Sequence, residues 1–306
     1  MIVSLGESLI DLIHTPGQEP EARVGGSPFN VAIAMARLGV ESGLVCPLST
    51  DAYGQRLAHT LRDHDVQQCV KECVKAPTAI AEVFTDSQGH PTYTFHREHT
   101  ADRALEVRPP LDSLPNSLTA LHFGSLVLAQ ESDWAAWKAA IVSARAQGAF
   151  IAFDPNLRVA LIDDMVQYRD RLSEAIELAD LIKASDEDLS LLTPGCHPEE
   201  RIQEWCAPHR TIVMTEGAQG AQIWTSNGVH TAFRDLGNPN VIDTVGAGDT
   251  FQAALLAWFW HQGVFHTDLS PDRAHQLLRF ACHAAALNCT QIGCNPPTIQ
   301  ELRLSL

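Results

Sequence analysis

The sequence predicts an α/β protein in which a doubly wound, mostly parallel sheet carries helices on both faces, with a small additional β-sheet. Three observations lead to this prediction. Short apolar runs alternate with helical stretches along most of the chain, as expected for strands that helices cover on both faces. Two extended segments in the first third break that alternation. The length of 306 residues leaves ample room for such a core.

The alternation can be followed element by element. A short apolar run occupies residues 1–5, strands are expected at 43–48, 120–123, 149–153, 181–184 and 210–215, and helices at 29–38, 53–64, 134–147, 168–179, 250–261 and 273–289. Gly39 suits the end of the first helix, because glycine adopts the left-handed conformation found there. In open sheets of this class, ligands bind beyond the carboxyl ends of the strands. Polar residues that follow the strands are therefore candidates for a site.

The two segments outside the alternation predict a lid. Residues 78–97 alternate as a hairpin around a turn at 86–91, and residues 12–24 are turn-rich and partly extended. We expect one domain over residues 1–306, with a lid formed by about 12–24 and 78–98. A simple β-excursion of the main sheet is the alternative interpretation. Because exposed strand edges are usually covered, a lid also predicts a homodimer that pairs through it.

Composition excludes several classes of protein. The formal net charge of −16 argues against non-specific binding to nucleic acid or to an anionic membrane. No apolar stretch approaches the roughly 20 residues that span a bilayer, and the N-terminus lacks the basic region of a signal peptide. The 8 cysteines are scattered and form no C-x-x-C pair. Together these features predict a reduced, cytoplasmic protein.

The most informative segment is Asp243-Thr-Val-Gly-Ala-Gly-Asp249, which leads into a helix rich in small residues. Gly246 and Gly248 leave amide N–H groups unobstructed where that helix begins, and such a helix start is an anion site. Asp249 falls in the first turn, where a carboxylate suits either a helix cap or a general base beside a phosphate. The second interpretation favours transfer of a phosphoryl group to a hydroxyl.

Two other segments place polar residues at strand ends or helix starts. Gly25-Gly-Ser-Pro-Phe-Asn30 combines close backbone approach with an amide that can recognise a sugar hydroxyl, although the segment taken alone favours a simple turn and helix start. Asp11, just after the first strand, is ambiguous by itself. Asp154-Pro-Asn-Leu-Arg158 ends an apolar strand, and Arg158 suits a phosphate, although a strand-to-loop turn is the alternative.

Several well-known motifs do not occur. No lysine is followed by Ser or Thr, so there is no Walker A loop, and no G-x-G-x-x-G follows the first strand. The G-x-S-x-G elbow and the H-E-x-x-H helix are also missing from the sequence. The cysteines lack a second ligand pair at zinc spacing, so structural thiols are favoured.

Taken together, these segments resemble the two signatures of the ribokinase-like carbohydrate kinases, also called the phosphofructokinase-B family. The segment from Gly25 to Gly39 is similar to the N-terminal signature, and Asp243 to Asp249 is similar to the C-terminal one. The resemblance extends over nearly the whole chain. It implies a doubly wound core with a small β lid, and transfer of the γ-phosphate of ATP, with Mg²⁺, to a sugar hydroxyl.

The resemblance also implies roles for individual residues. Asp249 matches the catalytic base, and Gly246, Ala247 and Gly248 match the anion hole. Sugar-binding positions fall on Asp11, Gly25, Gly26 and Asn30, and the nucleotide-binding turn on Thr215, Gly217 and Gly220. Backbone groups around Asp243, Val245 and Gly293 match the region that holds a monovalent cation such as K⁺.

Two positions depart from the family pattern. Ser185 and Asp188 stand where the family often carries Asn-x-x-Glu. Asp188 can still organise water around Mg²⁺, from a shorter side chain, and Ser185 remains on the nucleotide side. Cys282, followed by His283, stands where many relatives carry an Asn near the adenine, so we expect Cys282 to border the nucleotide.

The subfamily is suggested by residues 95–102 and 154–158, which resemble the fructokinase branch. This likeness implies that Arg97 contacts the sugar side of the cleft and Arg158 the phosphate side. The alternative for Arg97 is an ion pair at the rim worth at most about 1 kcal/mol. The 2-keto-3-deoxygluconate kinases and the aminoimidazole riboside and ribose kinases share much of the pattern. The sequence thus predicts an ATP-dependent sugar kinase, foremost a fructokinase. A non-catalytic sugar or nucleotide sensor and an acidic scaffold are the alternatives from other classes.

Overall fold

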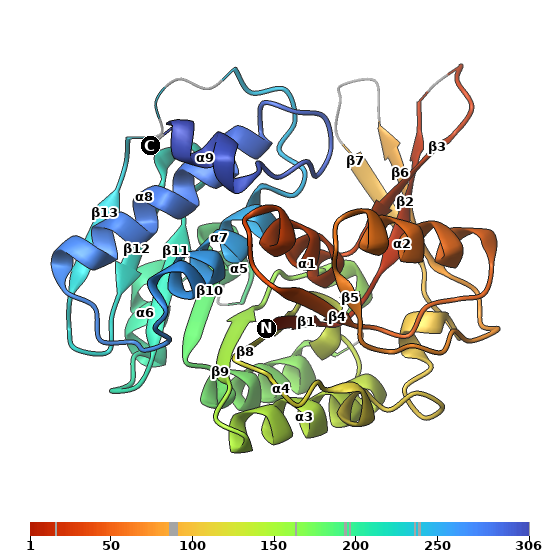
Figure 1. The fold of residues 1–306 in the computed structure, drawn as a ribbon, viewed down its shortest axis with the longest axis horizontal. Helices are drawn as coiled ribbons and strands as arrows, with labels where there is room; N and C mark the ends of the chain where they lie inside the picture. The colour runs from red at the N-terminus through yellow and green to blue at the C-terminus, as the bar shows by residue number, and fades with distance from the viewer. Residues whose placement is uncertain are drawn as a thin grey trace.

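A computed structural model of the chain describes residues 1–15, 17–85, 91–162, 164–192, 195, 197–235, 237 and 240–305. Most of the predicted hairpin turn at 86–91, and Pro16 within the predicted lid segment, lie outside the described residues. The described chain forms a large sheet flanked by helices and a separate small sheet (Figure 1). Within it, none of the helices has the length and apolar character needed to cross a bilayer.

The large sheet has the strand order β13-β12-β11-β10-β9-β8-β1-β4-β5. The strands from β11 to β5 in that order run parallel, whereas β12 and β13 add an antiparallel edge. Their bounds are β1 Ile2–Leu5, β4 Ser42–Val45, β5 Gln67–Gln68, β8 Ala120–Gly124, β9 Phe150–Asp154, β10 Leu181–Ser185, β11 Thr211–Thr215, β12 Ala221–Trp224 and β13 His230–Phe233. The predicted mostly parallel sheet is thus confirmed.

Helices cover both faces of this sheet, with one apolar cluster on each side. One cluster joins the strands to α3 and α4, which contain the buried Trp134, Trp137 and Tyr168. The other joins them to α1, α7 and α8, and α7 lies beside both of the other two helices (Figure 1). The helix bounds are α1 Ser27–Arg37, α2 Ala52–Asp63, α3 Glu131–Ala146, α4 Met165–Leu178, α5 Asp186–Leu192, α6 Pro198–Trp205, α7 Ala247–Gln262, α8 Pro271–Asn288 and α9 Ile299–Ser305, with 3₁₀ turns η1 Ala101–Arg103, η2 Pro110–Ser113, η3 Ser125–Leu128, η4 Val159–Leu161 and η5 Gly217–Gln219.

The small sheet stands beside the large one in the order β3-β2-β6-β7. It is formed by β2 Leu9–His14, β3 Glu21–Gly25, β6 Ala79–Thr85 and β7 Pro91–His96. The hairpin of β6 and β7 is antiparallel, as predicted, and β2 pairs with β6 in parallel. The segment is therefore a separate sheet and not an excursion of the large one. Its action as a lid on a single domain stays a prediction.

The structure also contains elements that the sequence analysis did not predict. The antiparallel strand β12 follows β11 after the turn η5, and a turn at Ser226-Asn-Gly228 joins β12 to β13. These strands have only four residues each, which is too short for a clear alternation. Strand β2 begins at Leu9, three residues before the predicted segment. Leu9 and Ile10 are buried, so the apolar start of this strand is continuous with the core.

Candidate active site

The carboxyl ends of the parallel strands bring several predicted residues to one edge of the large sheet. Strand β9 ends at Asp154, and the last residues of β10 and β11, Ser185 and Thr215, are directly paired. Helix α7 begins on the same side, as shown by the proximity of Gly248 to Lys183 on β10. This edge is where ligands bind in open α/β sheets, and it is the candidate active site.

The start of α7 has the backbone geometry that an anion site needs. Gly246 is the residue before the helix and has a φ of 75°, a conformation that favours glycine. A Cβ atom there would lie 2.3 Å from Cys294 Sγ, so the position also has no space for a side chain. The first intrahelical bond is from Thr250 N–H to Gly246 O at 2.8 Å. The amides of Gly248 and Asp249 come before Thr250, so no carbonyl of the helix lies one turn earlier to accept their hydrogen bonds.

Asp249 is buried, with 8% of its surface exposed. Its Oδ1 accepts a hydrogen bond from Ser27 Oγ at 2.6 Å and a longer one from Asn156 Nδ2 at 3.4 Å, while Oδ2 accepts one from Asn30 Nδ2 at 2.8 Å. These bonds connect the side chain to α1 and to the loop after β9. They do not connect it to the amides of α7, so they do not support the helix-cap interpretation.

Asp11 lies on β2 next to Gly25. A Cβ atom on Gly25 would lie 2.2 Å from Asp11 Oδ2, so this glycine is required for the carboxylate to occupy its position. Burial raises the pKa of Asp11 to about 6, the guanidinium of Arg158 opposes that shift, and the charge of Asp249 adds to it. Asp11, Arg158 and Asp249 therefore share one electrostatic environment, although they come from β2, the loop after β9 and α7.

Two residues that the sequence analysis did not assign connect these groups. Ser27 opens α1 and donates to Asp249, and Asn156 Nδ2 donates to Ser27 Oγ at 2.9 Å. Asn156 Oδ1 in turn accepts a hydrogen bond from Arg158 Nη1 at 2.7 Å. Asn156 has a φ of 37°, which is uncommon outside glycine and often marks a functional site. Both residues lie within the segments that the sequence singled out, but Asp249, to which both donate, is more than 90 residues away from each.

A buried ion pair beneath α7 was also not predicted. Lys183 Nζ lies 3.0 Å from Asp154 Oδ2, and both side chains are at most 5% exposed. A Cβ atom on Gly248 would lie 3.2 Å from Lys183 Nζ, which places this cation directly under the anion site. Burial raises the pKa of Asp154 to about 6, with Lys183 opposing the shift. A lysine inside an otherwise apolar strand was the available sequence signal.

The residues predicted for the nucleotide side lie at the ends of β10 and β11 and in α8. Ser185 and Asp188 form a reciprocal helix cap, because Asp188 Oδ2 accepts from Ser185 Oγ at 2.7 Å while Ser185 Oγ accepts from the Asp188 amide. Asp188 Oδ1 accepts from the Leu157 amide at 2.9 Å. Gly217 and Gly220 flank the 3₁₀ turn after Thr215. Cys282 is 3% exposed and belongs to the apolar cluster under α8. The nucleotide and Mg²⁺ roles of these residues stay predictions.

The three residues predicted to border a monovalent cation are close to one another. Asp243 Oδ2 accepts a hydrogen bond from the Gly293 amide at 2.8 Å, and Asp243 Oδ1 accepts one from the Val245 amide at 3.0 Å. The Val245 carbonyl accepts from Asn288 Nδ2 at 2.8 Å. In the described part of the chain, no group of three or more His, Cys, Asp or Glu side chains could hold a metal ion. The binding of a monovalent cation by backbone groups of this region stays a prediction.

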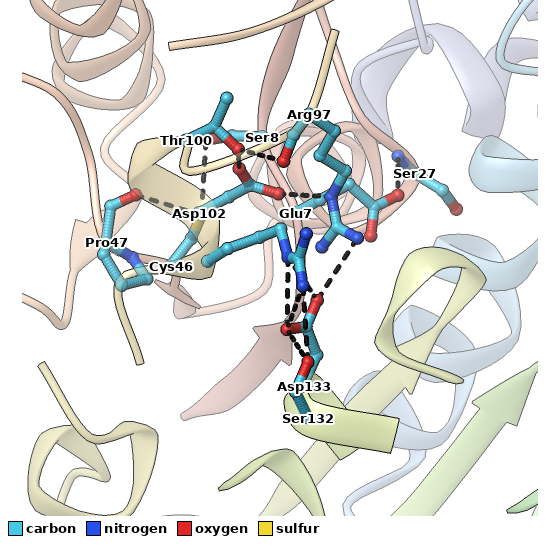
Figure 2. Close-up of polar contacts among 11 residues, drawn as sticks. Glu7, Ser8, Ser27, Cys46, Pro47, Arg97, Thr100, Asp102, Ser132 and Asp133 are labelled. Atoms are coloured by element: carbon cyan, nitrogen blue, oxygen red, sulfur yellow. Dashed lines mark hydrogen bonds and ion pairs between the residues drawn. The ribbon is translucent and has the colours of Figure 1, made fainter. Parts of the chain in front are cut away.

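Arg97 lies in a buried polar cluster at the end of β7. Its Nε donates to Asp102 Oδ2 at 2.7 Å, its Nη1 lies 3.4 Å from Asp133 Oδ2, and Arg103 also pairs with Asp133 (Figure 2). Glu7 contributes a further carboxylate, and burial raises the pKa of Glu7 despite the attraction of Arg97. Arg97 is only 7% exposed, so the rim ion pair considered as an alternative is wrong. Contact between Arg97 and a sugar stays a prediction.

The chain is similar to known proteins over nearly its whole length. Residues 1–301 match the model of the pfkB family carbohydrate kinases. The chain is 32% identical to fructokinase-2 of Solanum lycopersicum over 98% of this chain and 94% of the relative. It is similar to the crystal structure of a Vibrio cholerae fructokinase with fructose, ADP and calcium bound, with a TM-score of 0.85, 27% identity and coverage of 99% and 97%. A Xylella fastidiosa fructokinase with bound ATP gives a TM-score of 0.86, 26% identity and the same coverage.

Proposed function

The chain belongs to the pfkB family of carbohydrate kinases and is an ATP-dependent sugar kinase, and we propose that its acceptor is D-fructose. The observation that carries this proposal is the full-length similarity to fructokinases, one of which is named as binding fructose and ADP. In support, Asp11, Asn30 and Asp249 lie close together beside the small sheet, where a sugar with several hydroxyls would find both donors and acceptors.

In the proposed reaction, Asp249 is the general base. Its carboxylate accepts the proton of one fructose hydroxyl while that oxygen attacks the γ-phosphorus of ATP and ADP leaves. The amides at the start of α7, within Gly246, Ala247 and Gly248, hold the charge that develops on the phosphoryl group. Asp11, Gly25, Gly26 and Asn30 orient the sugar, and Arg158 binds the phosphate side. Closure of the small sheet would exclude water, which is a competing phosphoryl acceptor.

The nucleotide lies, in this proposal, along the carboxyl ends of β10 and β11, beside Ser185, Thr215, Gly217 and Gly220, with Cys282 bordering the adenine. Asp188 suits Mg²⁺ only through water, because both of its oxygens already accept hydrogen bonds from the protein. Mg²⁺ commonly binds through substrate phosphates and few protein ligands. When bound, it would neutralise charge on the β- and γ-phosphates. Backbone groups of Asp243, Val245 and Gly293 suit a K⁺ ion.

An acceptor panel tests the proposed substrate. The purified chain is given ATP and Mg²⁺ with fructose, ribose, 2-keto-3-deoxygluconate and a riboside, and ADP formation is measured at several concentrations of each acceptor. We expect fructose to have the highest kcat/KM. If another acceptor exceeds it, the substrate assignment is wrong. If ATP and sugar bind without ADP formation, the chain is a sensor.

Asp249→Asn tests the base, since it keeps the size of the side chain and removes its charge. We expect kcat to fall by about 10²- to 10⁴-fold, with ATP binding retained. Near-normal turnover would refute the assignment of Asp249. Leu191→Asn, which alters an exposed residue of α5, serves as the control for a substitution away from the site.

We also propose that the chain forms a homodimer through the small sheet. Its outer strands are β3 and β7, and strand edges that stay open tend to be covered by another chain. Light scattering at working concentration is expected to give twice the mass of 33.4 kDa. A monomer mass would contradict the proposal.

A further inference from the structure

The hydroxyl group of Ser27 is held in a single orientation between two polar partners. Ser27 Oγ lies 2.6 Å from Asp249 Oδ1, and it receives a hydrogen bond from Asn156 Nδ2 at 2.9 Å. A hydroxyl has one hydrogen to donate, and the Asn156 amide supplies the other hydrogen of this arrangement. The Ser27 hydrogen therefore points at Asp249 Oδ1. Ser27 is 7% exposed, so solvent does not compete for this bond.

The position of Ser27 is fixed by the surrounding structure. It is the first residue of α1, and its amide donates to the buried Glu7 Oε1 at 3.3 Å (Figure 2). Glu7 follows β1, and Arg97 faces it from the end of β7. On the other side, Asn156 is held by its bond to Arg158. Glu7 thus holds the backbone of Ser27, and Arg97 holds the charge of Glu7. Asn156 holds the Ser27 hydroxyl, and Arg158, the predicted phosphate-binding residue, holds Asn156.

The two oxygens of Asp249 have different environments. Oδ1 accepts from Ser27 and, at 3.4 Å, from Asn156, whereas Oδ2 accepts from Asn30 at 2.8 Å. Asn30 is only partly buried, and both Asn30 and Asp11, two of the proposed sugar-binding residues, lie near Asp249. A sugar hydroxyl can therefore replace Asn30 at Oδ2, while the buried Ser27 stays in place at Oδ1.

We propose that Ser27 is a positioning residue for phosphoryl transfer, whose hydroxyl holds Asp249 Oδ1 so that Oδ2 is the oxygen that receives the proton. This inference rests on the proposed role of Asp249. In the step, the acceptor O–H bond breaks and its proton goes to Oδ2. The new bond joins the acceptor oxygen to the γ-phosphorus, and the bond from that phosphorus to the bridging oxygen breaks, so that ADP leaves with the electron pair. Without Ser27, Oδ1 keeps only the longer hydrogen bond from Asn156 at 3.4 Å, so rotation of the carboxylate about its Cβ–Cγ bond is less restricted.

The test separates kcat from KM. Ser27→Ala removes the donor to Oδ1, and we expect kcat to fall about 10- to 100-fold, the range for a hydrogen bond to a charged group. The KM values for fructose and ATP are expected to stay within about twofold. Asn30→Ala is expected to show the opposite pattern, in which the KM for fructose rises and kcat changes less. Ser27→Thr keeps the hydroxyl and is expected to retain kcat within about threefold.

Ser42→Ala is the matched control. Ser42, on β4, is also buried, and its hydroxyl donates to the Ala32 carbonyl of α1 at 2.8 Å. It therefore bonds to the helix that Ser27 opens, through a backbone carbonyl and not through Asp249. We expect its kcat to be unchanged within about twofold. If Ser27→Ala does not fold, Asn156→Ala, which removes the donor to Ser27, carries the same expectation of a lower kcat.

Three results would overturn the proposal: an unchanged kcat in Ser27→Ala, an effect confined to the KM for fructose, or a folded Ser27→Thr variant as slow as Ser27→Ala. Failure of the proposed function looks different. In that case Asp249→Asn itself keeps its turnover, or fructose is not phosphorylated by the unmodified chain. Thermal unfolding of each variant confirms that the kinetics refer to folded protein.

Discussion

The ammonium group of Lys183 lies 3.0 Å from Asp154 Oδ2, and both side chains are buried beneath the start of α7. The pair joins β10 to β9 at the edge where the site is formed. Asp154 Oδ1 has no hydrogen-bond partner within the described residues, so the charge of this carboxylate is balanced mainly by Lys183. The arrangement therefore places a cation under the anion site, at the cost of burying two charges.

Lys183→Met is expected to reduce both stability and activity. The substitution leaves Asp154 buried without a counter-charge, which costs about 3–5 kcal/mol. The double variant Lys183→Met with Asp154→Leu is expected to recover most of that stability, because no unpaired charge remains. Its kcat is expected to stay low, since the cation near Gly248 is missing. Urea unfolding and steady-state kinetics measure the two effects, and a single variant as stable as the unmodified chain would refute the prediction.

Arg97→Met tests the polar cluster at the end of β7. Arg97 is the cation that faces Glu7, Asp102 and Asp133 together. Arg103 still pairs with Asp133 when Arg97 is removed, but the buried carboxylates of Glu7 and Asp102 lose the cation that faces them. We expect a loss of about 3–5 kcal/mol in the free energy of unfolding.

The control for this prediction is Arg201→Met on α6. Arg201 pairs with Glu204, which is 61% exposed, and pairs of that kind contribute at most about 1 kcal/mol. Equal losses in the two variants, measured by urea unfolding, would show that the burial of the Arg97 cluster has no energetic consequence.

Residues in local motifs could be predicted from the sequence, whereas residues whose partners are distant in the chain could not. The segments around Gly25 and Asp249 were found because their function depends on local backbone geometry, which a few consecutive residues encode. The parallel sheet also predicted that the two segments lie close together, because the carboxyl ends of its strands meet at one edge. The likeness to the fructokinase branch predicted that Arg97 contacts the sugar, which stays a prediction, but no local pattern reveals that Asp133, 36 positions later, lies beside it. Ser27 and Asn156 were missed for the same reason.

His122 is expected to make the fold sensitive to acid. Burial lowers its pKa to about 3, so the folded state holds it neutral while the unfolded chain protonates it near pH 6.5. The unfolded state thus binds more protons between these values, and stability falls as the pH is lowered through that range. Between pH 7.5 and pH 5, this single group accounts for a loss of about 2 kcal/mol.

His122→Asn removes that titration and keeps a polar neighbour for Ser4, whose Oγ lies 2.9 Å from His122 Nδ1. The variant is expected to lose about 2 kcal/mol less than the unmodified chain between the two pH values, in urea unfolding. His59→Asn, at a histidine whose side chain is 68% exposed, is the control for the same substitution at the surface. An identical slope for the His122 variant and the unmodified chain would contradict the prediction.

Asp11 gives the last prediction, in which stability and function oppose each other. Burial raises its pKa from 3.8 to about 6, so the folded state binds the proton more tightly than the unfolded chain does. Ionised Asp11 therefore destabilises the fold above about pH 6, and this cost is relieved on protonation. Asp11→Asn is expected to be more stable at pH 8 by about 1–3 kcal/mol.

The ionised form of Asp11 is the one that accepts hydrogen bonds from a sugar, so the KM for fructose should rise as the pH falls through about 6. In Asp11→Asn the KM should be high and should lose that pH dependence. Urea unfolding and KM values measured from pH 5 to 8 test both parts. If Asp11→Asn is less stable than the unmodified chain at pH 8, or if the KM of the unmodified chain does not change with pH, the proposed opposition between stability and binding at Asp11 is wrong.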